Sequence, residues 1–251
     1  MEIGQNIYFA SDFHLGAYVD DDQPLVREKK IVAWLDSIMD DCAELYLLGD
    51  VFDFWFEYRH VVPKGYVRLL GKLADFADRG IPIHIFTGNH DVWMFGYFTE
   101  QFNAQIHRSP VLREWSGKRF LIGHGDGLGP GDHGYKFIKR VFTNRLAQRL
   151  FAAMHPSFGV RLARFFSRTS RKATGDKDQT FLGDKEYLIQ YCKTYLQMEH
   201  IDYFIFGHRH LRIDEQVGER SRYINLGEWF SGTPYAVFNG EQLELLDYQP
   251  T

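Results

Sequence analysis

The chain has 251 residues, of which 45% are hydrophobic and 25% are charged, as in soluble globular proteins with room for one domain and an insertion. Its net charge of −4 does not favour nucleic acid as a partner, because nucleic-acid-binding domains are usually basic. Cys42 and Cys192 are the only cysteines, which suits a reducing compartment. The N-terminus lacks a signal-peptide pattern, and no apolar run reaches the ~18 residues of a membrane span. We therefore expect a cytoplasmic protein.

Strands and helices are predicted to alternate along the chain. An apolar strand at 6–10 precedes a helix at about 25–41, in which Ile31, Leu35 and Ile38 recur at helical spacing. A strand at 44–48, a helix at 65–79 and a strand at 81–86 continue the alternation. This pattern predicts an α/β fold. Further strands are expected at 120–122, 203–206, 223–226, 235–238 and 243–246.

Five segments with possible metal ligands each follow an apolar run, and four of them begin with glycine. Open α/β sheets bind ligands beyond the carboxyl ends of their strands, so these segments should meet at one edge. Their mixture of oxygen and nitrogen donors suits Mn, Fe or Zn better than Mg or Ca alone. The segments are Asp12-Phe13-His14, Gly49-Asp50, Gly88-Asn89-His90-Asp91, Gly123-His124-Gly125-Asp126 and Gly207-His208-Arg209-His210.

The order of these segments, D-x-H, GD, GNH, GH and GHxH, resembles the calcineurin-like metallophosphoesterases. The resemblance implies a β-sandwich flanked by helices and a site for two divalent cations. We expect these cations to be Mn, with Fe or Zn as alternatives. It places Asp12, His14, Asp50 and His210 on one metal, and Asp50, Asn89, His124 and His208 on the other. It also gives His90 a role in contacting the phosphate or protonating the leaving group, with Asp91 expected to orient its ring. Asp53 and Asp126 are expected to be supporting acids, and the alternative for Asp126 is a simple turn residue.

The stretch from Gly134 to Gly175 has no acidic residue and ten cations. Subtracting these ten charges from the net charge of −4 leaves −14 on the rest of the chain. We predict one domain, 1–251, with a basic amphipathic helical insertion at about 134–178. Such helices favour anionic membrane surfaces, but an ordinary helical hairpin with a solvated basic face is the alternative. The cations are Lys136, Lys139, Arg140, Arg145, Arg149, Arg161, Arg164, Arg168, Arg171 and Lys172.

Two further segments narrow the resemblance. Residues 50–55, Asp-Val-Phe-Asp-Phe-Trp, and 226–229, Leu-Gly-Glu-Trp, are similar to stretches of the UDP-2,3-diacylglucosamine diphosphatases of lipid A synthesis. The insertion falls where those enzymes carry a helical lid. The resemblance also implies a set of substrate contacts, and for those on the insertion the alternative is an ordinary surface residue. The substrate contacts implied by the resemblance are Asn89, His90, Asp132, Tyr135, Arg168, Ser170, Thr174, Lys177 and His208.

The sequence departs from that family at two positions. His90 stands where many members have arginine, and Arg209 stands where threonine is usual. The leading hypothesis is a Mn-dependent hydrolase that splits UDP-2,3-diacylglucosamine into UMP and 2,3-diacylglucosamine 1-phosphate. Its partners would be this amphiphilic nucleotide-sugar lipid and the anionic inner membrane, on whose cytoplasmic face it would lie as a peripheral protein. The alternatives are a phosphatase or phosphodiesterase acting on a soluble phosphoester, and a non-enzymatic scaffold. The sequence leaves the oligomeric state open.

Overall fold

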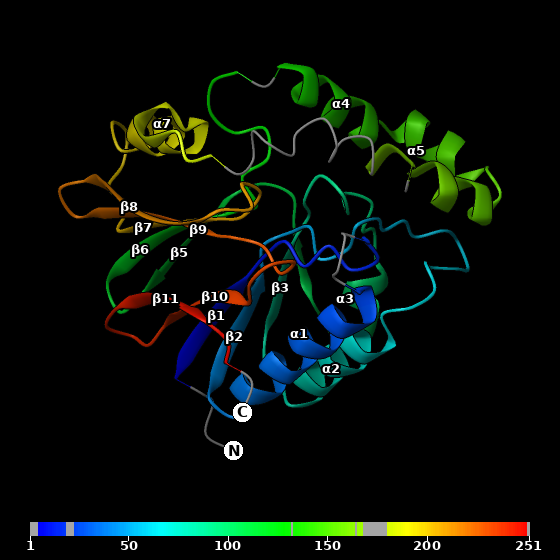
Figure 1. Cartoon of the computed structure of the whole chain (residues 1–251), viewed down its shortest axis with the longest axis horizontal. Coiled ribbons are helices and arrows are strands. Elements are labelled where there is room, and N and C mark those ends of the chain that lie inside the picture. Colours follow the sequence, from blue (N-terminus) through cyan, green and yellow to red (C-terminus); the bar gives the residue numbers. More distant parts are fainter. Residues whose placement is uncertain (1–4, 19–22, 132, 164, 168–179, 250–251) are drawn as a thin grey trace.

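The computed structural model describes residues 5–18, 23–131, 133–163, 165–167 and 180–249. Two β-sheets form its centre (Figure 1). In the first sheet, β1, β2, β3 and β4 run parallel, and β10 pairs antiparallel with β1. Its strands, in spatial order, are β11 (Leu243–Asp247), β10 (Pro234–Phe238), β1 (Asn6–Ala10), β2 (Cys42–Leu47), β3 (Ile83–Phe86) and β4 (Gln105–His107).

The second sheet is mixed. Strands β6, β7 and β9 are parallel, and antiparallel strands close both edges. The spatial order is β5 (Val111–Trp115), β6 (Lys118–Ile122), β7 (Tyr203–Phe206), β9 (Ser221–Leu226) and β8 (Arg212–Gly218).

Strand β1 shows how its sequence builds the layers. Successive side chains of a strand point to opposite faces. Ile7 and Phe9 enter the core between the two sheets, while Tyr8 and Ala10 enter the core beneath the helices. Burial on both faces explains why this strand is an almost continuous apolar run.

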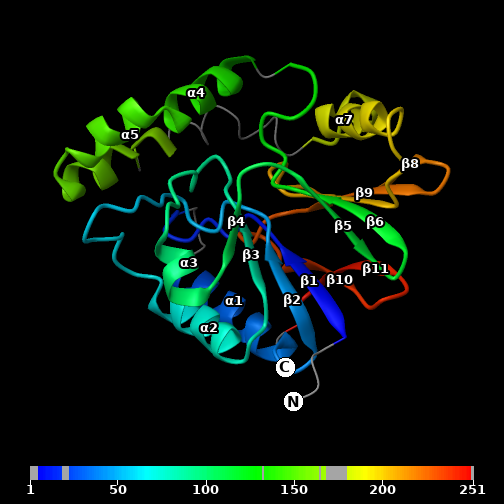
Figure 2. The same ribbon diagram turned by 180° about the vertical axis from the view of Figure 1, so that it is seen from behind.

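Helices cover the outer face of each sheet. Apolar residues of α1 (Pro24–Ile38), α2 (Val67–Asp78) and α3 (Tyr97–Phe102) pack in the core of the first sheet. After the short helix η1 (Gly183–Lys185), α7 (Tyr187–Tyr195) packs Leu188, Ile189 and Cys192 on the second sheet. The result is the helix-flanked β-sandwich that the resemblance implied (Figure 2).

The basic insertion begins with α4 (His133–Thr143) and α5 (Arg145–Ala152), and residues 156–163 and 165–167 are also helical. In both ribbon views, α4 and α5 lie at the top of the molecule, on the side of the loops that follow β1 and β2. Trp93 Nε1 donates a hydrogen bond to Phe142 O over 2.7 Å, and this contact joins the insertion to the core.

Several elements differ from the expectation. The helix expected at 25–41 ends at Ile38. Among the described residues, no helix is both long and apolar enough to cross a bilayer. The elements that we did not predict are α3, β4, β5, η1, α7 and β8.

Candidate metal centre

The ligand-bearing segments meet in space. Each follows a strand of the two parallel arrays, namely β1, β2, β3, β6 and β7. Their carboxyl ends lie at the same edge of the sandwich. Residues separated by almost 200 positions are therefore brought into contact there, as expected for a site in an α/β protein.

Asp12, His14, Asp50 and His210 form the first group, with one ligand atom of each within 4.8 Å of the others. His14 Nε2 lies 3.0 Å from His210 Nε2 and 3.6 Å from Asp12 Oδ1. His210 Nε2 lies 3.4 Å from the same Asp12 oxygen. Four donor atoms thus converge as the ligands of a single cation would.

Asp50, His124 and His208 form a second group within the same distance limit. His124 Nε2 lies 3.5 Å from Asp50 Oδ2 and 3.3 Å from Asn89 Oδ1. His124 Nδ1 lies 2.7 Å from Leu48 O. A proton on Nδ1 donated to this carbonyl leaves Nε2 as the atom that can bind a metal.

Asp50 belongs to both groups. Its Oδ1 accepts a hydrogen bond from His90 N over 2.8 Å. Its Oδ2 is buried without a hydrogen-bond partner among the described residues, and it lies 3.7 Å from His14 Nε2. Asp12 Oδ1 is likewise buried and unpartnered there. Leaving charged oxygens buried without a hydrogen bond is costly, so both oxygens fit cation ligands, and Asp50 fits a bridge between two cations.

The backbone at this centre is strained. Asp12, His14, Asp50, His208 and His210 all have positive φ, between 43° and 72°. Residues other than glycine rarely adopt this conformation, and it is concentrated at functional sites. The strain supports a role for these five residues beyond folding.

Two glycines permit the close approach of these loops. A Cβ atom at Gly88 would lie 2.2 Å from Asp50 Oδ1, and one at Gly207 would lie 2.4 Å from Asp12 Oδ2. Any larger residue at either position would displace a ligand carboxylate. This explains why glycine precedes the ligands in these segments.

Electrostatics also favour bound cations. Burial lowers the pKa of His14 to about 4 and that of His208 to about 4, so both rings are neutral and able to act as ligands. Burial is the largest single influence on His124 and acts in the same direction, but the carboxylates of Asp50, Asp12 and Asp126 together outweigh it and raise the pKa of His124 to about 10. The centre therefore has a negative potential that divalent cations would neutralise.

The expected pairing of His90 with Asp91 is wrong. Asp91 Oδ2 accepts hydrogen bonds from Val51 N and Phe52 N, and Oδ1 accepts one from Gly88 N. Asp91 is buried beneath the loops, where desolvation and the charge of Asp50 raise its pKa to about 7. The ring of His90 instead faces Asp53, whose side chain was expected to be a supporting acid.

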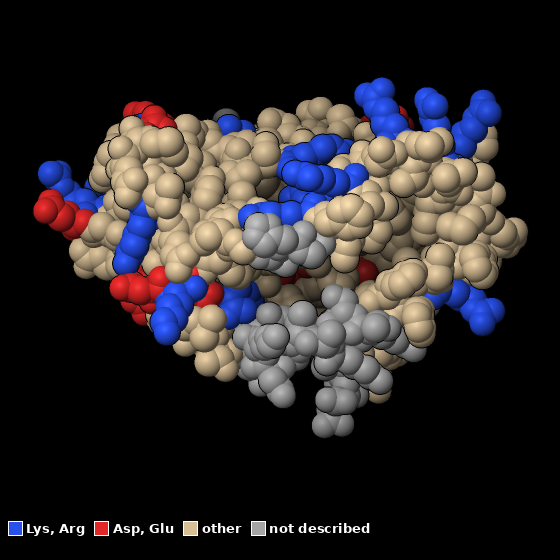
Figure 3. Space-filling view, turned by 90° about the horizontal axis from the view of Figure 1, so that it is seen from above, with Lys and Arg blue, Asp and Glu red and all other residues tan. Residues whose placement is uncertain are grey.

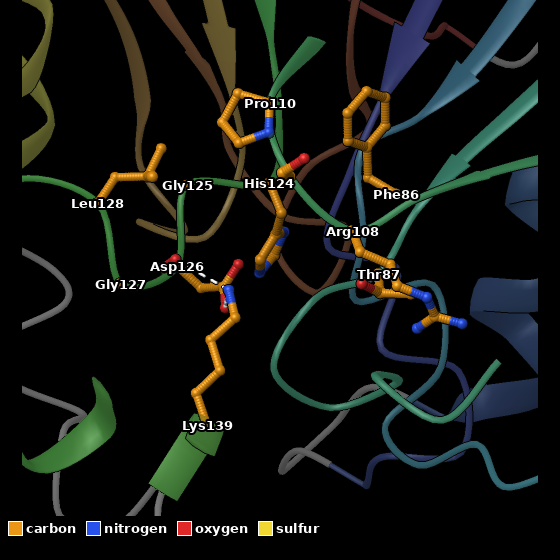
Figure 4. Close-up of a pocket in the computed structure, with 11 residues that line it drawn as sticks. Phe86, Thr87, Arg108, Pro110, His124, Gly125, Asp126, Gly127, Leu128 and Lys139 are labelled. Carbon is orange, nitrogen blue, oxygen red and sulfur yellow. Dashed lines mark hydrogen bonds and ion pairs between the residues drawn. The ribbon is translucent and has the colours of Figure 1, made fainter. Parts of the chain in front are cut away.

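A pocket of about 140 Å³ opens beside His124 (Figure 4). Phe86 and Arg108 form part of its lining, and Lys139 reaches it from α4. Lys139 Nζ lies 2.6 Å from Asp126 Oδ2. Asp126 therefore connects the loop of His124 with the basic insertion. This ion pair gives Asp126 a structural role in addition to its place in a turn.

Most of the expected substrate contacts lie outside the described residues. Tyr135 lies within α4, and its side chain is not among those described. The residues outside the described ranges are Asp132, Arg168, Ser170, Thr174 and Lys177.

Two residues that support the centre were not predicted. The buried Arg27 donates hydrogen bonds to His14 O over 2.8 Å and to Ala17 O over 2.9 Å. Phe230 stacks on the His14 ring with centroids 5.3 Å apart, and the Arg27 guanidinium lies 4.4 Å from the Phe230 ring centroid. An arginine in line with the apolar residues Ile31, Trp34 and Ile38 of α1 was the available sequence signal for Arg27.

Two relatives are similar to this chain over most of its length. A UDP-2,3-diacylglucosamine hydrolase from Porphyromonas gingivalis (strain ATCC BAA-308 / W83) is 40% identical over 253 residues, covering 95% of this chain and 96% of the relative. A UDP-2,3-diacylglucosamine hydrolase from Pectobacterium carotovorum subsp. carotovorum (strain PC1) is 27% identical over 208 residues, covering 81% and 85%. Among solved structures, the phosphoesterase YfcE from E. coli has a TM-score of 0.44 and 15% identity, covering 95% of this chain and 90% of that chain.

The sequence model described as calcineurin-like phosphoesterase matches residues 6–212. This range includes all five ligand-bearing segments and most of both sheets. The chain belongs to the calcineurin-like phosphoesterase family.

Proposed function

We propose that this chain is a metal-dependent hydrolase that splits the diphosphate of UDP-2,3-diacylglucosamine into UMP and 2,3-diacylglucosamine 1-phosphate. Asp50 Oδ2 carries the enzymatic part of the proposal, because it is buried between two groups of donors and has no hydrogen-bond partner in the described part of the chain. The relative with 40% identity across 95% of this chain supports the choice of substrate, because fold alone does not select one phosphoester.

The donors described above would hold two cations. Asp12, His14, Asp50 and His210 would hold the first, and Asp50 would share the second with Asn89, His124 and His208. When bound, divalent cations neutralise developing charge on the phosphoryl group and supply activated water. The oxygen and nitrogen ligands suit Mn, Fe or Zn better than Mg or Ca alone, and Mn is the metal of the leading hypothesis.

His90 is the residue best placed to act on the substrate beside these ligands. It follows Asn89, and its ring lies edge-on to that of His14 with centroids 4.9 Å apart. Its Nδ1 faces Asp53, so a proton held there leaves Nε2 free to contact a phosphoryl oxygen or the leaving group. Asp91 stabilises the loop that carries Asn89 and His90, because its carboxylate accepts a hydrogen bond from Gly88 N.

The acyl chains would bind under the insertion. Phe54, Phe56 and Trp93 form an apolar cluster with Phe142 and Phe151 of the insertion. The Phe151 ring packs in tilted geometry against Trp93 and Phe56, with centroids 4.6 and 4.8 Å apart. Large apolar surfaces next to a polar reaction centre suit an amphiphilic substrate. The substrate residues expected on the insertion remain part of this proposal.

The outer surface of the insertion would lie on the cytoplasmic face of an anionic membrane. Arg140, Arg145, Arg149 and Arg161 are exposed, and exposed apolar residues stand among them. In the view from above, Lys and Arg side chains project around the part of the molecule that carries the insertion (Figure 3). Cations interleaved with exposed apolar groups are typical of peripheral membrane binding. The exposed apolar residues are Phe137, Ile138, Val141, Leu146, Leu150, Phe158, Phe165 and Phe166.

The direct test is incubation of the full chain plus Mn with UDP-2,3-diacylglucosamine, with chromatography of the nucleotide product. We expect UMP, and we expect Asp50→Ala to release none above background. Hydrolysis of soluble aryl phosphates without UMP release would favour the soluble-phosphoester alternative. Absence of both activities in a protein that binds two metals would favour the scaffold alternative.

A further inference from the structure

One hydrogen bond joins the insertion to the neighbourhood of the metal centre. Ser167 Oγ donates to Asp53 Oδ1 over 2.7 Å. Ser167 is 7% exposed and Asp53 is 5% exposed, so the bond is buried at both ends. The two residues are separated by 114 positions, and this contact depends on how the insertion sits on the core.

The surroundings of Ser167 distinguish it from a space-filling residue. Phe165 and Phe166, immediately before it, are 64% and 58% exposed. In this turn two aromatic side chains face outward while the hydroxyl is buried. Burying a hydroxyl is unfavourable unless it has a hydrogen-bond partner, so the Asp53 carboxylate is what makes serine suitable here.

The same carboxylate faces the candidate catalytic histidine. His90 Nδ1 lies 3.2 Å from Asp53 O and 3.6 Å from Asp53 Oδ1. Asp53 thus lies between the hydroxyl of Ser167 and the ring of His90. The Asp53 carbonyl accepts the Nδ1 proton and so fixes the tautomer of the ring. The Asp53 carboxylate, 3.6 Å from Nδ1, is an electrostatic neighbour of the ring, and its hydrogen bond from Ser167 holds this residue in place.

We propose that Ser167 is a positioning residue, which acts through Asp53 to hold the His90 ring in its reactive orientation when the insertion is seated. This proposal rests on the function proposed above for His90. The proposal links enclosure of the substrate with the chemical step, because the Ser167 hydroxyl belongs to the same insertion that packs on the apolar cluster of Phe54, Phe56 and Trp93. Preorganised side chains of this kind depend on the residues that support them.

The test compares Ser167→Ala with Ser157→Ala in the full-length protein. Ser157 is exposed on the same insertion and provides a matched loss of one hydroxyl. With UDP-2,3-diacylglucosamine and saturating Mn, Ser167→Ala should lower kcat by roughly tenfold, the scale of one hydrogen bond to a charged group. Its KM should stay within about twofold, because direct substrate binding is not the role assigned. Ser157→Ala should behave as the wild type.

A double-mutant cycle separates positioning from general weakening of the fold. In a His90→Ala background, Ser167→Ala should cost little further kcat, since its effect passes through the missing ring. An equal loss in both backgrounds, or unchanged kcat in Ser167→Ala, would overturn the proposal. A change confined to KM would overturn it as well, and would assign Ser167 to substrate binding.

A measurement independent of activity distinguishes this proposal from the proposed function. In metal-free protein labelled with ¹⁵N-histidine, the ring signals of His90, identified by their loss in His90→Ala, should move in Ser167→Ala and not in Ser157→Ala. Moved signals in a protein that releases no UMP would support positioning while the proposed substrate fails. Unmoved signals in an active enzyme would overturn positioning while the function stands.

Discussion

Arg209 and Glu186 form a buried bidentate ion pair. The Nε–Oε2 and Nη2–Oε1 distances are both 2.9 Å. Arg209 stands between the candidate ligands His208 and His210, and its Nη2 also donates to Thr180 O over 3.0 Å. The loop with these two candidate ligands is thereby attached to the segment that enters η1 and α7. This contact gives a structural reason for arginine where the resemblance led us to expect threonine.

Glu186→Ala should destabilise the protein strongly. The substitution leaves the buried guanidinium without its carboxylate, and breaking a buried ion pair from one side typically costs about 3–5 kcal/mol. For a chain of this size the melting temperature should fall by roughly 6–20 °C. Metal occupancy at limiting Mn should fall too, because the ligand loop loses its attachment.

Asp40→Ala is the matched control for this change. Asp40 pairs with Arg79 over 2.8 Å on the exposed surface, where ion pairs contribute at most about 1 kcal/mol. Thermal denaturation of both variants measures the difference directly. Equal melting temperatures for Glu186→Ala and Asp40→Ala would show that the buried ion pair contributes no more to stability than the exposed one.

Asp50→Ala should remove more metal than any other single ligand substitution. Asp50 contributes to both donor groups, so its loss weakens both sites, whereas His210→Ala affects one. Elemental analysis after dialysis should find two metals per wild-type chain, one or none in Asp50→Ala, and at least one in His210→Ala. Asp126→Ala, which removes a nearby acid paired with Lys139, should keep two. Two tightly bound metals in Asp50→Ala would rule out the bridging role.

The segments that meet at the candidate metal centre could be predicted because each is encoded locally. In four of the five segments a buried strand, a glycine and a polar residue follow one another in the sequence, and the carboxyl ends of the strands bring the segments together. The contacts around the ligands are not local. Arg27 and Phe230 support His14 from 13 and 216 positions away, and neither has a spacing that points to it.

The error over Asp91 has the same physical origin. Adjacency to His90 suggested contact, but neighbouring side chains in a turn point in different directions. The turn directs Asp91 toward Val51 N and Gly88 N, and the fold brings Asp53 to His90 instead.

Strand β8 was not predicted for a related reason. Ile213 and Val217 are its buried residues, so pairing with β9 defines it rather than an apolar run.

His90→Ala should keep both metals and slow turnover. Loss of a general acid or a phosphate contact typically costs ~10²–10⁴-fold in rate. Steady-state kinetics on the lipid nucleotide and on an aryl phosphodiester separate the two roles. A leaving-group acid matters less when the leaving group is already good, so a much smaller loss on the aryl substrate identifies one. Equal losses on both substrates would instead assign His90 to phosphate positioning.

The insertion should bind anionic vesicles through electrostatic attraction and apolar contact. Each cation close to such a surface contributes roughly 1 kcal/mol, and salt screens this attraction over a Debye length of about 10 Å at 0.1 M. Wild-type protein should therefore sediment with anionic vesicles at low salt and less at high salt. Replacement of the exposed Arg145, Arg149 and Arg161 by glutamate should abolish sedimentation with the vesicles. The same variant should hydrolyse the lipid nucleotide more slowly. Its hydrolysis of a soluble phosphodiester should persist, because the candidate metal ligands are unchanged.

The control for charge is a second triple variant, with Lys29, Arg68 and Arg220 replaced by glutamate. These residues are exposed on α1, on α2 and at the end of the β8–β9 turn, and their replacement changes the net charge by the same amount. This variant should still bind vesicles, since attraction depends on which face carries the cations. If both triple variants lose binding alike, net charge rather than the insertion governs attachment. If wild-type protein stays in the supernatant at low salt, the insertion is not a membrane-binding surface, and its exposed apolar residues then act in substrate enclosure or contact another protein.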